Sequence, residues 1–600
     1  MKNKLVNVFS SQLLQVATAS ALFLASFSSA FVFEAQASIE LVSPGQKRAG
    51  WVFKEAGVLP VFVAGRLKPV DTMARETVMF ITGSRTWGGW EPLELLLSWV
   101  SAPQVWETVE FVQVNREDVR KQLGLDPQKT RFSPKELVET SYLSQYADKM
   151  PGGAQLSNPP LAGGAGMKQH PRDQELARVL ERVGAFRGIT SGEAWLFVPR
   201  PEPQEWQGLT AGNPAGASSS DMTIRLLASQ WISTYAKANL AEFAEATLKL
   251  QSGIESQITG FSDSTRGHLY WEAFYNRVRP FMSAWIFYVI GALLLLLGVA
   301  TRSTDADEKT EAQKVSPTSR FLNYGGLTFV ALGFFSTIGG IWIRVMVSGR
   351  PPVTNMYESM VWVSFGCVFF AWILYFFQKQ TVLLTVAAAV GGITLIIADS
   401  SPALLDPGIH PLVPVLKSNY WLTIHVLTIT LGYAAFALTL GLGNVGLYHY
   451  IRGQHRPGAQ AKIFAMNALT YRAMMFGVVL LAAGTILGGV WADYSWGRFW
   501  GWDPKEVWAL IALLGYVTVL HARYTGWMGQ FGFTAWTVIS FLLVVMAWYG
   551  VNFVLGVGLH SYGFSSGGQA GMAVFSTVQL SYVALAAFRK MKSPQHAAKV

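Results

Sequence analysis

The sequence has a single cysteine, Cys367, among 600 residues. One thiol excludes an intrachain disulfide, a CxxC redox pair, a Cys-rich metal site and a CxxCH motif that would hold heme covalently. Cys367 lies inside an apolar run, and we interpret it as a small buried residue. Charged residues are also scarce, at 14% against 51% hydrophobic residues, and the mean hydropathy is +0.29. This composition excludes a soluble globular protein of average type.

The charge that is present is unevenly distributed. Residues 38–280 contain 26 Lys/Arg and 26 Asp/Glu, so the formal net charge of +10 resides in the rest of the chain. Most of this excess falls in short segments between apolar runs, a pattern typical of membrane topology. A nucleic-acid-binding protein would instead carry a basic face on a soluble domain. We therefore expect no nucleic-acid partner.

The first 37 residues have the layout of an export signal. Lys2 and Lys4 precede an apolar stretch, and Ala35-Gln36-Ala37 has the A-x-A form of a cleavage site. The apolar stretch is long for a signal peptide, so an uncleaved anchor is the alternative. In both cases the segment that follows is expected outside the cytoplasm.

Nine apolar runs after Phe281 each have roughly the 20 residues needed to cross a bilayer. They begin near residues 281, 321, 358, 381, 421, 472, 506, 532 and 571. Residues 38–280 contain no such run and no catalytic motif, and their helical periodicity, with Asp221 as a start signal, predicts a soluble, mainly helical domain. The predicted fold is an all-α polytopic membrane protein with about nine transmembrane helices and this additional domain.

The expected divisions are a signal peptide or anchor (1–37), an extracytoplasmic domain (38–280), a transmembrane helix (281–300), a cytoplasmic linker (301–320), a membrane domain (321–590) and a cytoplasmic tail (591–600). With residues 38–280 outside, the outer segments between spans carry only Arg350, Lys417, Arg498 and Lys505. The inner segments then hold most of the remaining Lys and Arg, as the positive-inside rule requires.

The segment WGRFWGWDPKEVW (496–508) places four tryptophans between two spans, around a predicted outer loop at 491–505. Part of it has an ordinary explanation. Asp503, Pro504 and Glu506 have the form of a helix start, with a carboxylate N-cap, proline at the first position and glutamate at the third. Interfacial tryptophans are also common in the aromatic belt of membrane proteins.

The remaining tryptophans allow a second interpretation. Trp496, Trp500 and Trp502 fall within one short loop just after Trp491, and flat indoles suit stacking on a large flat ligand. Arg498 and Lys505 could pair with carboxylates of such a ligand. The loop sequence alone leaves both interpretations open.

Two histidines that are predicted to lie at the outer membrane surface, as the tryptophan loop does, favour the ligand-binding interpretation of the loop. His425 lies at the start of one span and His560 in the loop after another, so both flank the tryptophan loop on the outer side. Two imidazoles around an aromatic surface suit the two axial positions of a heme. His521 lies 18 residues after Asp503, about 27 Å along a helix, and belongs near the inner surface. If His521 also binds heme, heme passes from an inner to an outer site.

The segment GGVWADYSWGRFWGWDPKEVWALI resembles the WWD signature of heme-handling membrane proteins. With the upstream segment GRPPVTNMYESMVW (349–362), the sequence is similar to the CcsA type, the membrane component of the system II cytochrome c synthetase, over residues 321–590. The resemblance implies that non-covalent heme b moves outward as a substrate. Its vinyl groups would then form thioethers with the CxxCH cysteines of apocytochrome c, which is the activity of a cytochrome c heme lyase.

The resemblance also implies roles for individual residues. His425 and His560 match the outer axial ligands of the heme iron, and His521 matches the membrane histidine of the inner site. The outer heme platform would comprise Trp496, Gly497, Arg498, Trp500, Trp502 and Asp503. No catalytic residue is identified. The family pairs its inner histidine with one from a ResB/CcsB-type partner, and residues before 321 show no clear ResB motif. The implied location is the bacterial cytoplasmic (inner) membrane, with the WWD loop on the periplasmic side.

Three other functions stay open on sequence grounds. A heme exporter or chaperone would need the same sites without forming thioethers. A respiratory subunit with a resident b-type heme would place histidine pairs across spans and would not need an exposed tryptophan loop. A structural assembly factor would bind no heme.

Overall fold

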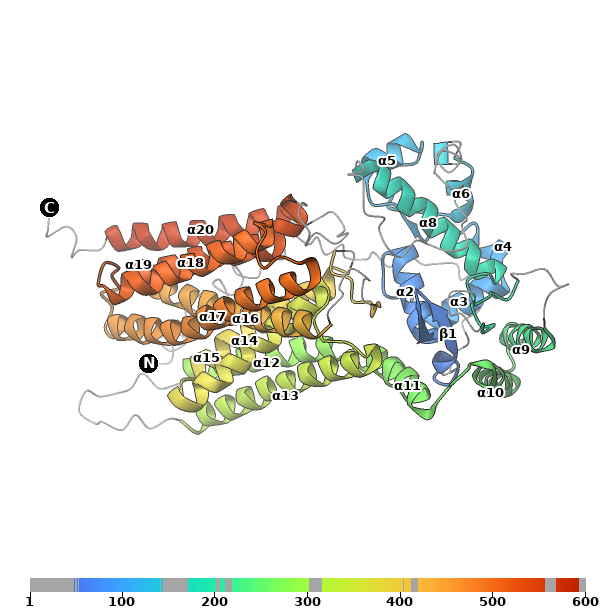
Figure 1. Cartoon of the computed structure of the whole chain (residues 1–600), viewed down its shortest axis with the longest axis horizontal. Helices are drawn as coiled ribbons and strands as arrows, with labels where there is room; N and C mark the ends of the chain where they lie inside the picture. The colour runs from blue at the N-terminus through green and yellow to red at the C-terminus, as the bar shows by residue number, and fades with distance from the viewer. Residues whose placement is uncertain are drawn as a thin grey trace, which may run out of the picture.

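The computed structural model describes residues 48, 51, 53–140, 142–143, 171–200, 206–210, 218–301, 316–402, 404–411, 419–555 and 568–592. The predicted leader at 1–37, the tail at 593–600, most of the predicted linker and His560 lie outside these residues. The described chain forms a helical bundle and, before it in the sequence, a domain of helices and four short strands (Figure 1).

The domain before the bundle is mainly helical and includes two short antiparallel hairpins. Strands β1 (Pro60–Val63) and β2 (Arg66–Pro69) pair with Val63 opposite Arg66, and β3 (Val112–Gln113) pairs with β4 (Arg131–Phe132). Its helical elements are η1 (Ala56–Val58), α2 (Val70–Thr82), α3 (Pro92–Ser101), α4 (Pro103–Trp106), α5 (Glu117–Gln122), α6 (Pro134–Val138), α8 (Pro171–Ser191), α9 (Ser219–Ala236), α10 (Leu240–Gln257) and α11 (Asp263–Val278).

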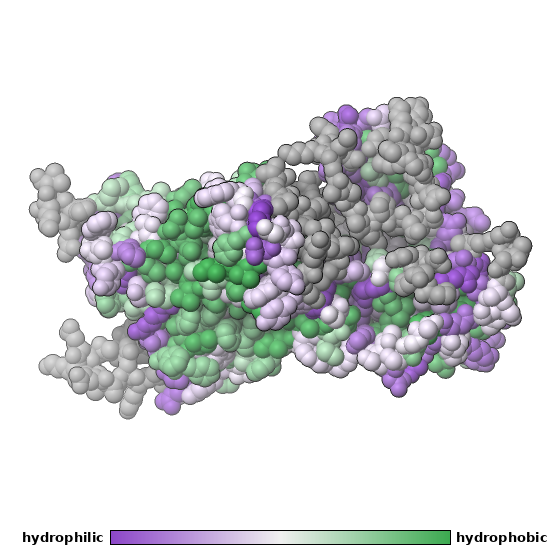
Figure 2. Space-filling view, viewed as in Figure 1, coloured by the Kyte–Doolittle hydropathy of each residue, from purple (hydrophilic) through white to green (hydrophobic). Residues whose placement is uncertain are grey.

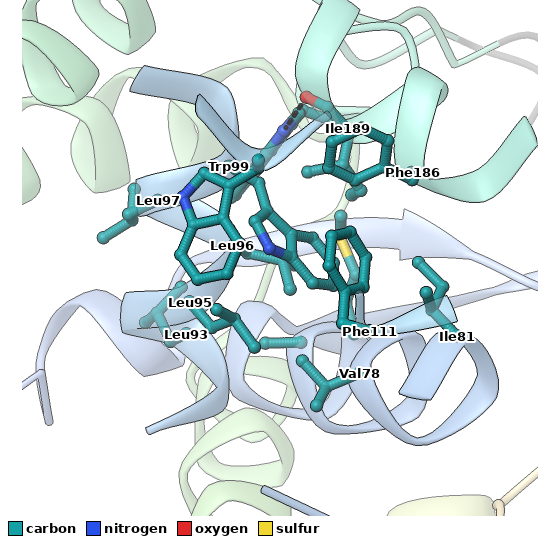
Figure 3. Packing of buried hydrophobic residues seen from close by; sticks show 14 of the residues in the cluster. Val78, Ile81, Leu93, Leu95, Leu96, Leu97, Trp99, Phe111, Phe186 and Ile189 are labelled. Carbon is teal, nitrogen blue, oxygen red and sulfur yellow. Dashed lines mark hydrogen bonds between the residues drawn. The ribbon is translucent and has the colours of Figure 1, made fainter. Parts of the chain in front are cut away.

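Aromatic packing gives this domain its own core. Trp99 and Phe111 stack at 5.1 Å between ring centroids, and Phe186 of α8 packs edge-on against both (Figure 3). The predicted start of the helix at Asp221 is confirmed with one refinement. Ser218 is the N-cap of α9, and Asp221 completes the capping box from the third position.

The bundle confirms the predicted membrane fold. The described residues contain nine segments long and apolar enough to span a bilayer, and Figure 2 shows hydrophobic residues along the visible side of the bundle. The helices are α12 (Pro280–Ala300), α13 (Pro317–Ser348), α14 (Met356–Gln378), α15 (Thr381–Ser400), α16 (Asn419–Arg452), α17 (Ala459–Trp496), α18 (Pro504–Tyr524), α19 (Gln530–Val545) with its π-helical continuation η4 (Met546–Leu555), and α20 (Gln569–Met591).

One end of the bundle faces the domain. Helix α11 leads from the domain into α12 through a break at Arg279, which has a positive φ of 50° and an ion pair with Asp399 at the end of α15. We call this the domain-facing end; α12, α14, α16, α18 and α20 begin there, because successive helices alternate in direction (Figure 1). The opposite end is called the far end.

Glycines bring α16 and α17 unusually close. A Cβ at Gly432 of α16 would lie 3.0 Å from the backbone nitrogen of Leu481, and one at Gly484 of α17 would lie 2.7 Å from Cα of Ile429. Backbones can approach this closely only where side chains are absent. This contact fixes the start of α16 against the end of α17, where the predicted site residues lie.

Candidate functional site

His425 of α16, Trp496 of α17 and the turn that leads into α18 lie at the domain-facing end. Helix α17 continues through Trp496, so the turn is Gly497–Asp503, shorter than the loop predicted at 491–505. Gly497 ends α17 with a positive φ of 72°, and its N–H donates to the carbonyl of Asp493. Such a left-handed C-terminal residue is the usual role of glycine.

The imidazole of His425 is held by backbone and ring contacts. Its Nδ1 lies 2.8 Å from the carbonyl oxygen of Gly484, and its ring is parallel to Trp491, with 6.2 Å between centroids and 7° between planes. A Cβ at Gly488 would lie 2.6 Å from Cε1 of His425. Two glycines and one tryptophan of α17 therefore determine where this imidazole lies.

A chain of rings connects His425 to the turn. Trp491 is only 1% exposed and meets Trp496 nearly edge-on, with 4.6 Å between centroids. The guanidinium of Arg498 lies over Trp496 at 5.8 Å from its ring centroid. Trp496 thus lies between the buried tryptophan beside the histidine and a cation in the turn.

Arg498 and Glu506 hold the turn together. The guanidinium lies 3.6 Å from the Glu506 carboxylate and packs over Gly501, where any side chain would overlap with it. The other Glu506 oxygen accepts hydrogen bonds from the backbone N–H groups of Gly501 and Asp503, at 2.8 and 3.1 Å. Arg498, which the sequence offered as a partner for ligand carboxylates, already has a carboxylate partner within the chain.

Trp502 has a strained backbone conformation, and it lies between Gly501 and Asp503, whose N–H groups bind Glu506. Its φ is +57°, and its side chain is 73% exposed. A bulky residue in the left-handed region costs roughly 1–3 kcal/mol and persists only where its surroundings impose it. Glu506 imposes it here by binding the N–H groups on either side, and the result is an indole directed away from the protein.

The structure confirms the ordinary interpretation of the sequence around Asp503. Asp503 is the N-cap of α18, with Pro504 following and Glu506 completing a capping box, and its side chain is buried. Its carboxylate accepts from the backbone N–H of Lys505 at 3.0 Å. Asp503 therefore has a structural role that any start of α18 would require.

The rings of Trp491, Trp496, Trp500 and Trp502 do not form one flat surface. Trp500 and Trp502 meet at 89° with 5.9 Å between centroids, and Trp491 and Trp496 form a separate pair at 65°. The described residues contain no group of three or more His, Cys, Asp or Glu that could hold a metal ion. Within them, His425 is the imidazole that lies beside the tryptophans.

His521 is not brought to this place. His521 lies in the last turn of α18, exposed and at the far end, about 27 Å from Asp503 by the helical rise. His560 lies outside the described residues. The bundle thus keeps His425 and His521 at opposite ends, as the sequence predicts.

Sequence reasoning did not predict the contacts that shape the site. Trp491, Gly484 and Gly488 set the position of His425, and Glu506 sets that of Trp502. A signal for the glycines was present, because Gly484 and Gly488 are four residues apart and so share one helical face in a span. Trp491, three residues further on, lies on the same face.

Known proteins match this chain over both parts. Residues 353–560 match the family model described as cytochrome C assembly protein. Cytochrome c biogenesis protein CcsA of Synechococcus sp. (strain RCC307) is 35% identical over 305 residues, which cover 46% of this chain and 93% of that protein. CcsA of Guillardia theta is 34% identical over 268 residues, 41% of this chain and 86% of that protein.

A longer relative extends the match into the N-terminal domain. Protein NrfI of Wolinella succinogenes is 28% identical over 512 residues, which cover 83% of this chain. The aligned residues span only about half of NrfI, at 53% of its length. Because nearly the whole of a CcsA protein aligns with this chain at 35% identity, the chain belongs to the CcsA family of membrane proteins that act in cytochrome c biogenesis.

Proposed function

We propose that this protein brings heme to its domain-facing end and attaches it to the CxxCH cysteines of an exported apocytochrome c. The observation that supports this most directly is the imidazole of His425, oriented by the Gly484 carbonyl and stacked on Trp491. It lies beside a turn that directs an exposed indole outward. The heme in this proposal is a non-covalently bound heme b and is the substrate.

The chemistry of His425 fits heme iron. When Nδ1 carries the proton, the Nδ1–H group donates a hydrogen bond to the Gly484 carbonyl, and the available lone pair of the imidazole is on Nε2. Hydrogen bonding of the second ring nitrogen to a carbonyl is the usual way in which proteins orient a metal-binding histidine and raise its basicity. The parallel Trp491 ring limits rotation of the imidazole, so the ligand is preorganised.

The reaction is an addition that needs orientation more than acid or base. Each cysteine S–H adds across the C=C bond of one vinyl group. The sulfur forms a bond to one carbon and the hydrogen atom is transferred to the other, so no atom or electron is lost. Heme fixed at His425 presents its vinyl groups in one place, and the exposed Trp502 indole offers a surface beside it. Holding both reactants in position supplies most of the rate in such a step.

The proposal assigns further roles on the family resemblance. His560 is the second axial ligand at the outer site, and His521 is a ligand of an inner entry site. Trp496, Trp500 and Trp502 contact the heme, and a ResB/CcsB-type partner supplies a second inner histidine. The protein then lies in the bacterial inner membrane with residues 38–280 and the tryptophan turn on the periplasmic side.

The first experiment tests covalent attachment. The chain is expressed with an exported CxxCH apocytochrome, with and without a ResB/CcsB-type partner, in cells that lack other maturation genes. Heme-stained cytochrome that survives a denaturing gel supports the proposal. Heme that purifies with the chain but is never transferred would instead support a heme exporter or chaperone, and a chain that binds no heme in any combination would contradict both.

The second experiment tests the ligand. His425→Gly is expected to abolish holocytochrome formation, and added imidazole is expected to restore it by occupying the vacated position. His268→Gly, at a half-buried histidine of α11, is the matched control and retains activity. For His521, substitution is expected to lower total heme occupancy. Wild-type amounts of product from both His425→Gly and His560→Gly would overturn the ligand assignment.

A further inference from the structure

A hairpin of the N-terminal domain docks on the bundle. The turn Ala64–Gly65 has two positive φ angles, 54° and 80°, as a two-residue hairpin requires, and a Cβ at Gly65 would lie 3.4 Å from the side chain of Pro411. The next residue, Arg66, donates from Nε to the carbonyl of Ile409 at 2.8 Å. The tip of β1–β2 therefore contacts the segment 404–411, which follows α15.

Arg66 is itself fixed. Its two terminal nitrogens bind both oxygens of Glu272 on α11, at 2.6 and 2.7 Å, and Glu272 is almost fully buried. A bidentate pair of this kind sets the orientation of the guanidinium as well as its position. The hairpin, α11 and the segment 404–411 are thereby joined at one point.

The same segment is held from its other side by a buried arginine of α13. Arg344 is 4% exposed and donates to the carbonyls of Pro407, at 2.8 Å, and Gly408, at 3.3 Å. Both carbonyls belong to half-buried residues, and backbone carbonyls that are shielded from water need donors. The segment 404–411 thus lies between one arginine of the domain and one of the bundle.

Glu358, in the first turn of α14, pairs with Arg344 and with a second arginine, Arg350. Its carboxylate accepts from Arg344 at 2.7 Å, from Arg350 at 3.1 and 3.2 Å, and from the backbone N–H of Thr354 at 2.8 Å. Burial, opposed by Glu358 and reinforced by Arg344, lowers the pKa of Arg350 from its ordinary value. The group remains a cation, so the single negative charge of Glu358 is shared by two buried arginines.

The residues around Glu358 contact η4. The indole N–H of Trp548 donates to Oγ of Ser359 at 2.8 Å, and the amide of Asn552 donates to the sulfur of Met356 at 3.4 Å. Asn552 is 6% exposed, so this contact is internal. π-Helical turns are rare and frequently occur at functional sites, and here the π-helical turns end α19 at the domain-facing end.

We propose that Glu358 is a positioning residue that couples docking of the N-terminal domain to the placement of η4. The hairpin contact at Ile409, the Arg344–Glu358–Arg350 cluster and the Ser359–Trp548 hydrogen bond then act as one unit. The domain is in this view a part of the heme-attachment machinery, because its docking sets the geometry of the bundle end where the substrate is held. That functional consequence rests on the proposed function; the coupling itself does not.

The test is a double-mutant cycle read by hydrogen–deuterium exchange in the heme-free full chain. The hairpin variant is Arg66→Met with Glu272→Gln, so that no carboxylate stays buried without its cation. The bundle variant is Ser359→Ala, which removes one acceptor from Trp548 at little cost to folding. Each is expected to raise exchange of the amides of residues 546–555 several-fold, and the combination is expected to raise it no further than the larger single effect.

Controls and outcomes are defined on the same peptides. Arg116→Gln removes an exposed ion pair with Asp118 in the same domain and is expected to leave residues 546–555 unchanged. Coupling is overturned if the hairpin variant loosens 404–411 but leaves 546–555 at the wild-type rate, or if the two effects simply add. Glu358→Gln, where it folds, is expected to reproduce both effects.

The outcomes also separate this inference from the proposed function. Coupled exchange in a chain that never forms holocytochrome leaves the inference standing and rejects the function. Holocytochrome formation at wild-type level by the hairpin variant, with exchange at 546–555 unchanged, rejects the inference and leaves the function standing.

Discussion

The imidazole of His425 lies parallel to the indole of Trp491, with 6.2 Å between centroids, and both belong to the tightly packed pair α16–α17. This contact predicts that Trp491 affects heme binding without touching iron. Trp491→Phe keeps an aromatic face and is expected to bind heme as the wild type does. Trp491→Leu keeps an apolar side chain without the parallel ring and is expected to weaken heme binding by about 10–100-fold, the usual range for residues that orient a metal ligand.

Absorption spectra of purified protein titrated with heme measure this effect. Loss of the ring also lets the imidazole rotate, so the Soret band of Trp491→Leu is expected to shift as well as weaken. Equal affinity and identical spectra for the Leu and Phe variants would show that the stack has no part in ligand orientation.

A methyl group at Gly488 provides a sharper test of the same geometry. The Cβ of Gly488→Ala would lie 2.6 Å from Cε1 of His425, so the imidazole has to move. We expect heme affinity to fall by about 10–100-fold while the nine spans still form. Gly339→Ala on α13, where a Cβ meets nothing within 4 Å, is the matched control. Affinity at the wild-type level in Gly488→Ala would mean that heme binds elsewhere.

The sequence predicted the membrane fold because the physics there is local. A run of about 20 apolar residues has few alternatives to a spanning helix, and the nine runs appear as α12–α20. Eight helices begin close to the predicted residues, whereas α17 begins at Ala459, well before the start predicted near 472. The helix start at Asp503 was equally readable, since a capping box is complete within four residues. Each of these features depends only on neighbours in the chain.

The features that sequence reasoning missed depend on distant partners. Arg66 and Ile409 are 343 residues apart, and His425 and Gly484 are 59 apart. Nothing within either local segment indicates which partner it finds. The sequence also does not indicate how the tryptophan rings are oriented relative to one another, for a related reason. Helix α17 extends to Trp496, so backbone geometry directs Trp496 and Trp502 differently.

The N-terminal domain should lose stability on acidification through Asp221. The guanidinium of Arg200, 2.8 Å away, holds the pKa of this carboxyl below its ordinary value of 3.8. A carboxyl with a depressed pKa in the folded protein contributes stability that is fully present above 3.8 and is lost as pH falls through the lower folded value. As the pH is lowered from 6 to 2.5, the melting temperature is therefore expected to fall more steeply for the wild type than for Asp221→Asn.

The control for this experiment is a carboxylate whose ion pair, with Arg266 at 2.9 Å, is exposed to solvent and therefore adds little stability. Asp263→Asn alters a side chain that is 98% exposed at the start of α11 and is expected to leave the slope unchanged. A slope for Asp221→Asn equal to that of the wild type would contradict the assignment of acid sensitivity to the Arg200–Asp221 pair.

Trp502 is predicted to trade stability for function. Its φ of +57° is unfavourable for tryptophan and easy for glycine, and its side chain is 73% exposed, so little burial is lost on truncation. Trp502→Gly is expected to stabilise the protein by about 0.5–1 kcal/mol, after the entropic cost of glycine in the unfolded chain is subtracted, and to lower holocytochrome formation.

Trp500→Gly is the matched control, because Trp500 is half-buried and has no positive φ. It is expected to lower both the stability of the protein and holocytochrome formation. Thermal melts in detergent and heme-stained gels measure the two quantities. A Trp502→Gly variant that is less stable than the wild type would show that the strain is absent, and one with full holocytochrome formation would remove Trp502 from the proposed heme contact.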